Sequence, residues 1–241
     1  MKIEAHNQFG IYHFLPKRLR DLVDKWKDFT PFEIAIMLKT SAALLSIALF
    51  IRLTFSISSN GNIQTFDESI LKWVESLRTP FWNSMMLDVT ALGGLALTVV
   101  LGTLATVIFL LSDDIAAAVH LILTSTGGFF ISSWTKNIIS RPRPSVIPQL
   151  IHASGFSYPS GHAVTSAAIY LTMAILACRH YKGYKNRLIL LALAALMITL
   201  ISFSRIYLGV HYPSDTMSGA LIGIAWALFM AALFSKTHFS K

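Results

Sequence analysis

The chain has 241 residues, of which 54% are hydrophobic and only 13% are charged. Soluble domains usually carry about 25% charged residues, so this composition excludes an ordinary water-soluble globule, and its hydrophobicity excludes a disordered chain. The net charge of +8 does not indicate binding to nucleic acid, because the basic residues lie in short clusters between apolar runs. The composition is that of an integral membrane protein embedded in the lipid bilayer.

Residues 1–33 are polar and basic, without the pattern of a cleavable signal peptide, and predict a cytoplasmic N-terminal arm. A spanning helix needs about 20 mostly apolar residues, and six later segments qualify. Between the first two, residues 66–87 carry apolar side chains at helical spacing and predict a helix at the membrane interface. The six predicted spans are 34–57, 91–111, 115–134, 163–178, 188–208 and 216–234.

This pattern predicts an all-α, polytopic membrane protein. Its six transmembrane helices form a bundle over residues 34–235, and a short cytoplasmic tail follows at 236–241. Most of the Lys and Arg residues outside the spans fall on the side of the N-terminal arm, and such residues are enriched in cytoplasmic segments. Both termini are therefore predicted to be cytoplasmic.

Three groups of polar residues lie at the ends of predicted spans. No span separates the first group from the second, and two spans separate the second from the third. All three groups therefore return to one side of the membrane, which this topology makes the outside. The groups are Lys136 with Arg143; Ser160, Gly161 and His162; and Arg205 with His211 and Asp215.

The chemistry of the three groups also converges. Lys136, Arg143 and Arg205 are three cations, which together favour a polyanion such as phosphate. Ser160 and Gly161 stand where a helix starts, so free backbone N–H groups and the positive end of the helix dipole point at the same place. The three groups therefore predict a phosphate-binding site.

The two histidines supply what phosphate binding alone would not require. His211 can attack phosphorus or act as a base, and Asp215, four residues later, can reach its other ring nitrogen. His162 can protonate a leaving oxygen. The spacing alone does not decide which histidine attacks.

Each feature has a simpler interpretation when it is taken alone. Arg141, Arg143 and Lys136 fit ordinary charged flanks of a membrane segment, residues 159–161 fit a helix-capping turn, and His211 with Asp215 fits a structural pair. The joint occurrence in one predicted context favours a catalytic site.

At these residues the sequence resembles the type 2 phosphatidic acid phosphatase superfamily, whose pattern is K-x6-RP, then PSGH, then SR-x5-H-x3-D. Every specified position is matched in order by Lys136, Arg143-Pro144, residues 159–162, Ser204-Arg205, His211 and Asp215. The resemblance implies a six-helix, metal-independent lipid phosphatase without a cofactor. His211 would be the nucleophile that forms a phosphohistidine, Asp215 would orient it, and His162 would be the general acid. The phosphate would be bound by Lys136, Arg143, Ser160, Gly161 and Arg205.

The leading interpretation is hydrolysis of a phosphorylated membrane lipid on the outer face of a bacterial plasma membrane. Polyprenyl pyrophosphate, phosphatidylglycerophosphate and phosphatidic acid are the expected substrates. A lipid A phosphatase or a lipid-to-lipid phosphotransferase with the same site is an alternative. A non-catalytic membrane scaffold or a lipid transporter is an alternative of another class, although neither has a chemical reason to keep both histidines and Asp215.

Overall fold

The structure is a computed structural model that describes residue 16 and the ranges 29–59, 62–181 and 183–235. Most of the predicted arm and the whole predicted tail lie outside the described residues. The chain divides into two compact units, 1–38 and 39–241. The helix bundle and the candidate site belong to the second unit.

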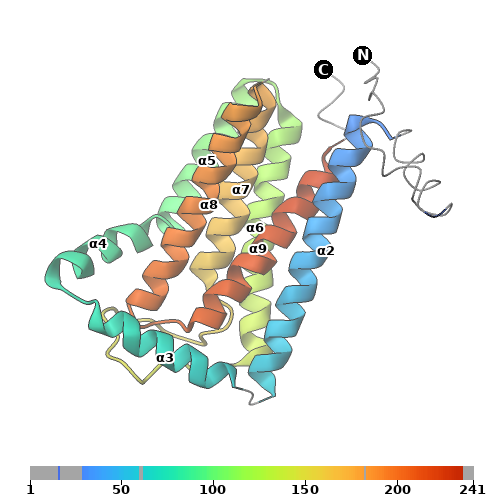
Figure 1. The fold of residues 1–241 in the computed structure, drawn as a ribbon. Coiled ribbons are helices and arrows are strands. Elements are labelled where there is room, and N and C mark those ends of the chain that lie inside the picture. Colours follow the sequence, from blue (N-terminus) through green and yellow to red (C-terminus); the bar gives the residue numbers. More distant parts are fainter. Residues whose placement is uncertain (1–15, 17–28, 60–61, 182, 236–241) are drawn as a thin grey trace. The chain divides into compact units, whose positions relative to one another are not determined.

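The regular elements of the described residues are all helical, which confirms the all-α prediction (Figure 1). A short 3-10 helix, Cys178–His180, follows directly after α7. The α-helices are α2 (Pro31–Ser58), α3 (Ile63–Ser76), α4 (Pro80–Ala91), α5 (Leu95–Leu111), α6 (Ile115–Ile139), α7 (Gly161–Ala177), α8 (Tyr184–Tyr207) and α9 (Pro213–Leu233).

Five of these helices are long and apolar enough to cross a membrane, and a sixth span results if α4 and α5 are counted together. The predicted span 91–111 is wrong in its start, because α4 and α5 are separate helices that meet at a bend of 42°. The break falls at Gly93, where a Cβ atom would lie 2.4 Å from the side chain of Ile201. The close approach of α8 therefore requires glycine at this point.

The predicted interfacial helix 66–87 is also two helices in the structure. The first, α3, ends at Ser76, and α4 starts at Pro80. The hydroxyl of Thr79 accepts a hydrogen bond from the Trp82 N–H, and Pro80 occupies the first helical position. This capping and the fixed φ of proline start a new helix inside one apolar pattern.

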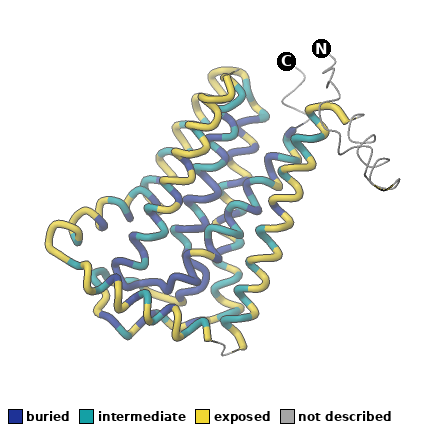
Figure 2. The backbone as a smooth tube through the Cα atoms, in the orientation of Figure 1, coloured by how far each residue is buried: buried dark blue, intermediate teal, exposed yellow. Residues whose placement is uncertain are grey.

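The helix α7 is the centre of the bundle and packs against α6, α8 and α9. Figure 2 shows that buried backbone concentrates on the inner helices, while the outward faces are exposed, as expected where lipid would cover them. Small residues let α9 approach α7 closely. A Cβ atom at Gly219 would lie 2.7 Å from the Ser160 carbonyl oxygen, and one at Gly223 would lie 2.5 Å from that of Val164. This Gly-x3-Gly contact holds the N-terminal ends of α7 and α9 together.

The helix α3 covers the end of the bundle where α8 ends and α9 begins (Figure 1). Its inner face buries Leu71 and Val74 against the segment between these two helices, including Tyr207, Val210 and Tyr212. Asp67 lies one turn before Leu71 and is also fully buried. A carboxylate on an otherwise apolar helix face requires partners, and these lie in the candidate site.

Candidate active site

The helix ends that carry the predicted residues meet at one end of the bundle. Lys136 is in the last turn of α6, His162 is in the first turn of α7, Arg205 is in the last turn of α8, and Asp215 is in the first turn of α9. His162 lies within electrostatic range of Lys136, Arg143, Arg205 and His211. The structure thus brings residues that are far apart in the sequence together at the same end of the helix bundle.

His211 and Asp215 lie beside each other in the segment that leads into α9. The Nδ1 atom of His211 is 3.5 Å from Oδ2 of Asp215, and the same oxygen accepts a hydrogen bond of 2.9 Å from the Tyr212 N–H. Because the carboxylate is held by this amide at the start of the helix, it faces one side of the imidazole. A proton on Nδ1 would leave the lone pair of Nε2 free for attack.

The imidazole of His211 is buried, with 2% of its surface exposed. Burial lowers its pKa to about 4, against the opposing influence of Asp215. His211 is therefore neutral near pH 7, which is the state that a nucleophile needs. Its Nε2 atom lies 3.4 Å from an Nη1 atom of Arg143, so the cationic part of the site adjoins the nitrogen that would attack.

Backbone carbonyls hold two of the three predicted cations. Lys136 donates a 2.7 Å hydrogen bond to the Phe156 carbonyl oxygen. Arg143 donates to the carbonyl oxygens of three residues, Ser154, Gly155 and Val210. Burial lowers the pKa of Arg143, but a guanidinium keeps its charge under ordinary conditions. The loop between α6 and α7 therefore fixes both cations without neutralising them.

The third cation, Arg205, is 5% exposed and donates one hydrogen bond of 2.8 Å to the Thr90 hydroxyl. Its Nε atom is buried without a hydrogen-bond partner. Within the described ranges, no carboxylate oxygen lies within 4 Å of the charged nitrogens of Arg205, Lys136 or Arg143. A buried charge such as that of Arg205 normally has a counter-charge. Together with the partly buried Lys136 and Arg143, it therefore indicates a site for an anion.

The start of α7 adds neutral donors to the same place. The Ser160 hydroxyl is fully buried and has no hydrogen-bond partner, while the Ser160 N–H donates to the Asp215 carbonyl oxygen at 3.0 Å. Gly161 is the first residue of α7, and a Cβ atom at this position would lie 4.0 Å from the Lys136 side chain. The hydroxyl and the first amides of α7 thus adjoin the cations, as an oxyanion site requires.

Arg141 is the residue whose importance the sequence did not reveal. We considered it as an ordinary charged flank, but the structure buries it to 7% exposure and places it between two carboxylates. Its Nη1 atom donates to Asp215 at 2.7 Å, and its Nη2 atom donates to Asp67 at 2.8 Å. Burial opposes the charge, but Asp215 and Asp67 together raise the pKa of Arg141. The signal that could have indicated this pair is a carboxylate, Asp67, on the apolar face of α3.

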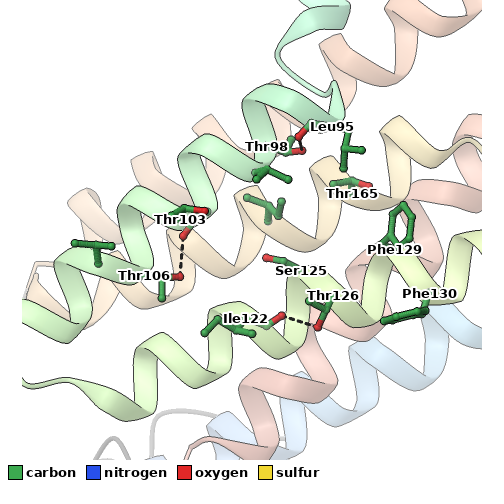
Figure 3. Close-up of a pocket in the computed structure, with 14 residues that line it drawn as sticks. Leu95, Thr98, Thr103, Thr106, Ile122, Ser125, Thr126, Phe129, Phe130 and Thr165 are labelled. Carbon is green, nitrogen blue, oxygen red and sulfur yellow. Dashed lines mark hydrogen bonds between the residues drawn. The ribbon is translucent and has the colours of Figure 1, made fainter.

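Two cavities adjoin the candidate site. A cavity of about 180 Å³ is lined by Lys136, Gly161 and His162. A larger one, of about 580 Å³, lies between α5, α6 and α7 and is shown in Figure 3. Leu95, Phe129 and Thr165 line both cavities.

Although hydroxyls line the larger cavity, several of them are already bonded within their own helices. Those of Thr106 and Thr126 donate to the carbonyl oxygens four residues earlier, at 2.7 and 2.8 Å. Because these donors are satisfied, the cavity surface is effectively apolar. An apolar cavity therefore lies next to the cavity that Lys136 and His162 line, with three lining residues in common.

A helical membrane bundle that gathers unpaired cations and two histidines at one end has the features of an integral-membrane phosphatase. Comparison with known proteins supports this class. The PAP2 superfamily model matches residues 117–239, which is about half of the chain. The chain belongs to the PAP2 superfamily.

Similar proteins cover most of the chain. Phosphatidylglycerophosphatase B of Bacillus subtilis (strain 168) is 29% identical over 185 residues, which is 75% of this chain and 89% of that protein. Lipid A 4'-phosphatase of Bacteroides thetaiotaomicron is 25% identical over 178 residues, or 67% and 73% of the two chains.

A solved structure gives the same result. The crystal structure of a transmembrane PAP2-type phosphatidylglycerolphosphate phosphatase from Bacillus subtilis has a TM-score of 0.77, with 26% identity over 83% of this chain and 98% of that one. This likeness confirms the predicted fold class and the predicted family. The chain is a membrane phosphatase of the PAP2 type.

Proposed function

We propose that this PAP2 phosphatase hydrolyses the phosphate headgroup of a membrane lipid through a phosphohistidine at His211. The observation that carries the proposal is a set of three cations without a carboxylate partner among the described residues, beside a neutral, buried imidazole. Arg205 is buried, Lys136 and Arg143 are partly buried, and Arg143 lies 3.4 Å from Nε2 of His211. Phosphoryl transfer spreads negative charge over three equatorial oxygens, so it is catalysed by cations in fixed positions. Lys136, Arg143 and Arg205 would bind these oxygens, together with the Ser160 hydroxyl and the Gly161 amide.

The reaction follows two steps. Nε2 of His211 attacks phosphorus, the bond from phosphorus to the lipid oxygen breaks, and His162 gives its proton to that oxygen. Water then attacks the phosphohistidine while His162 takes a proton from it, which releases inorganic phosphate and restores both histidines. Asp215 holds Nδ1 of His211 and stabilises the positive charge that develops on the ring.

This mechanism assigns to three side chains the charge that many soluble phosphatases take from a metal ion. In the ranges that the structure describes, no three His, Cys, Asp or Glu side chains come together as a metal site. We propose a metal-independent reaction because the three cations can supply this charge, and chelation tests it directly.

A lipid substrate is supported by the apolar cavity that lies next to the site and shares three lining residues with the cavity at His162. From Leu95 to Val107 the cavity follows α5 over thirteen residues. The twelve steps between them span about 18 Å at 1.5 Å per residue. One leaflet of hydrocarbon is about 15 Å deep. A single hydrocarbon chain of the substrate would fit this space while its phosphate reaches His162 and Lys136. Among lipid phosphates, phosphatidylglycerophosphate is favoured by the similarity to the Bacillus phosphatase.

The proposed topology places the site on the outer face of a bacterial plasma membrane, with both chain termini in the cytoplasm. It is supported by the bias of Lys and Arg toward the segments before α2 and between α7 and α8.

The decisive experiment combines phosphoenzyme trapping with a histidine substitution. The purified protein in detergent is mixed with lipid phosphate labelled on phosphorus and quenched in alkali, which preserves phosphohistidine. We expect a labelled protein and free phosphate from the wild type, and neither from His211→Ala. His180→Ala, at the opposite end of α7, is the matched control and should behave as the wild type. Full turnover by His211→Ala would refute the mechanism.

The same assay separates hydrolysis from transfer to a second lipid. A hydrolase releases all of the label as inorganic phosphate, whereas a phosphotransferase passes it to an added acceptor lipid. Label in the acceptor would favour the transferase alternative, and the phosphoenzyme would be common to both.

A further inference from the structure

The helix α3 reaches the candidate site through one buried carboxylate, Asp67. It accepts three hydrogen bonds: from Arg141 at 2.8 Å, from the Ser214 N–H at 2.9 Å, and from the Ser214 hydroxyl. Its exposed fraction is 0%. A carboxylate in this position does not touch the cationic cleft, but it binds the arginine that binds Asp215.

Arg141 joins the two carboxylates with the fork of its guanidinium. One nitrogen donates to Asp215 and the other to Asp67, at 2.7 and 2.8 Å, and the group stacks on the Tyr212 ring with 4.0 Å between Cζ and the ring centroid. The Gln64 amide oxygen accepts a further hydrogen bond of 2.8 Å. The planar guanidinium is thus held by α3 and by the start of α9 at the same time.

Charge counting shows what Asp67 adds. One arginine between two carboxylates leaves the group with a net charge of −1, and Asp215 is the member that faces His211. If Asp67 were neutral, Arg141 would cancel the charge of Asp215. The imidazole of His211 gains positive charge when Nε2 attacks phosphorus, and a net negative group on its Nδ1 side stabilises that charge.

We infer that Asp67 is a positioning residue for the phosphoryl transfer, which acts through Arg141 on Asp215 and so on His211. This inference rests on the proposed function of His211. It gives α3 a role in the chemical step, in addition to covering the end of the bundle.

The test is the variant Asp67→Asn, which keeps the shape and removes the charge. We expect kcat to fall about ten-fold or more, because the developing positive charge on His211 loses its net negative neighbour, while KM stays within about two-fold. Glu75→Gln removes a charge from the same helix two turns later, away from Arg141, and should leave both constants unchanged. Thermal unfolding of each variant in detergent shows whether the fold is intact.

A double-mutant cycle separates positioning from a structural role. The variant Arg141→Met no longer connects Asp67 with Asp215. In this background, Asp67→Asn should therefore change kcat by less than about two-fold. Equal losses in both backgrounds, or wild-type kcat for Asp67→Asn, would overturn the inference. If the wild type forms no phosphohistidine, the proposed function fails; if it forms one and Asp67→Asn turns over normally, only the role of Asp67 fails.

Discussion

The variant Gly223→Ala tests whether the contact between α7 and α9 sets the geometry of the active site. A Cβ atom at 223 would lie 2.5 Å from the Val164 carbonyl oxygen and 2.7 Å from Cβ of Ala167. Ordinary contact begins near 3.4 Å, which is 0.9 Å more than the shorter distance. Neither neighbour is the flexible end of a side chain, so the two helices must move apart by nearly that distance.

This separation acts on catalysis because α7 carries His162 and α9 carries Asp215. Overpacking of this kind costs about 1–3 kcal/mol of stability, and a displacement near 1 Å of reacting groups can cost about 100-fold in rate. We expect kcat/KM to fall by about 10- to 100-fold and the unfolding temperature to drop. The loss in rate should exceed what partial unfolding of the sample explains.

The assay is phosphate release from a lipid phosphate in detergent micelles, measured beside thermal unfolding. Gly183→Ala is the matched control, because its Cβ atom would meet nothing closer than the Asn186 side chain at 4.0 Å and it precedes α8 at the end away from Arg205. It should retain wild-type rate and stability. If Gly223→Ala also retains them, the close helix contact does not determine the position of the catalytic groups.

Three further predictions concern the chemistry. Because burial lowers the pKa of His211 to about 4, an NMR titration should show this imidazole neutral at pH 5–6, with His211→Gln used to assign its signal. The imidazole of an unfolded chain binds its proton near pH 6.5, so the stability of the fold should decrease as the pH drops from about 6.5 to 4. A His211 pKa near 6.5 would contradict this prediction. Treatment with a chelator should leave phosphate release unchanged, whereas a loss restored by Mg²⁺ would contradict the metal-free mechanism. Gly102→Phe should fill the cavity of Figure 3, since a Cβ atom there meets nothing within 4 Å. It should lower the ratio of kcat/KM for long-chain over short-chain substrates by about ten-fold, whereas the control Leu104→Phe, on an exposed part of the same helix, should leave the ratio unchanged. An unchanged ratio for both variants would show that the hydrocarbon chain of the substrate does not bind in this cavity.

The sequence predicted the bundle well because the apolar length of a span is a local property. Spans such as 115–134 and 188–208 correspond to α6 and α8, although both helices extend a few residues further. The errors lie where tertiary packing decides. The break at Gly93 depends on Ile201 of α8, and no local pattern of hydrophobicity contains that contact.

For the candidate site, the residues in the family pattern could be read from the sequence, but their partners could not. Lys136 ends α6 and Arg143 follows in the next loop, and the parity of the spans brings them to the side of His211. Asp67 has no motif, and its pairing with Arg141 joins positions 74 residues apart. Such a pair becomes predictable only from burial: a carboxylate in register with Leu71 and Val74 on the inner face of α3 must find a cation.

The two halves of the site differ in charge, and His211 lies between them. On one side of the His211 ring, Nε2 faces Arg143 and the region where the phosphate would bind; on the other, Nδ1 faces Asp215 and the Arg141 group of net charge −1. In water these charges would be screened, whereas in the buried site they act on the ring from fixed positions. The cationic half binds the phosphate and stabilises the negative charge of the transition state, and the anionic half stabilises the ring after attack. Lys136→Ala should therefore raise KM and also lower kcat, whereas Asp67→Asn should lower kcat alone.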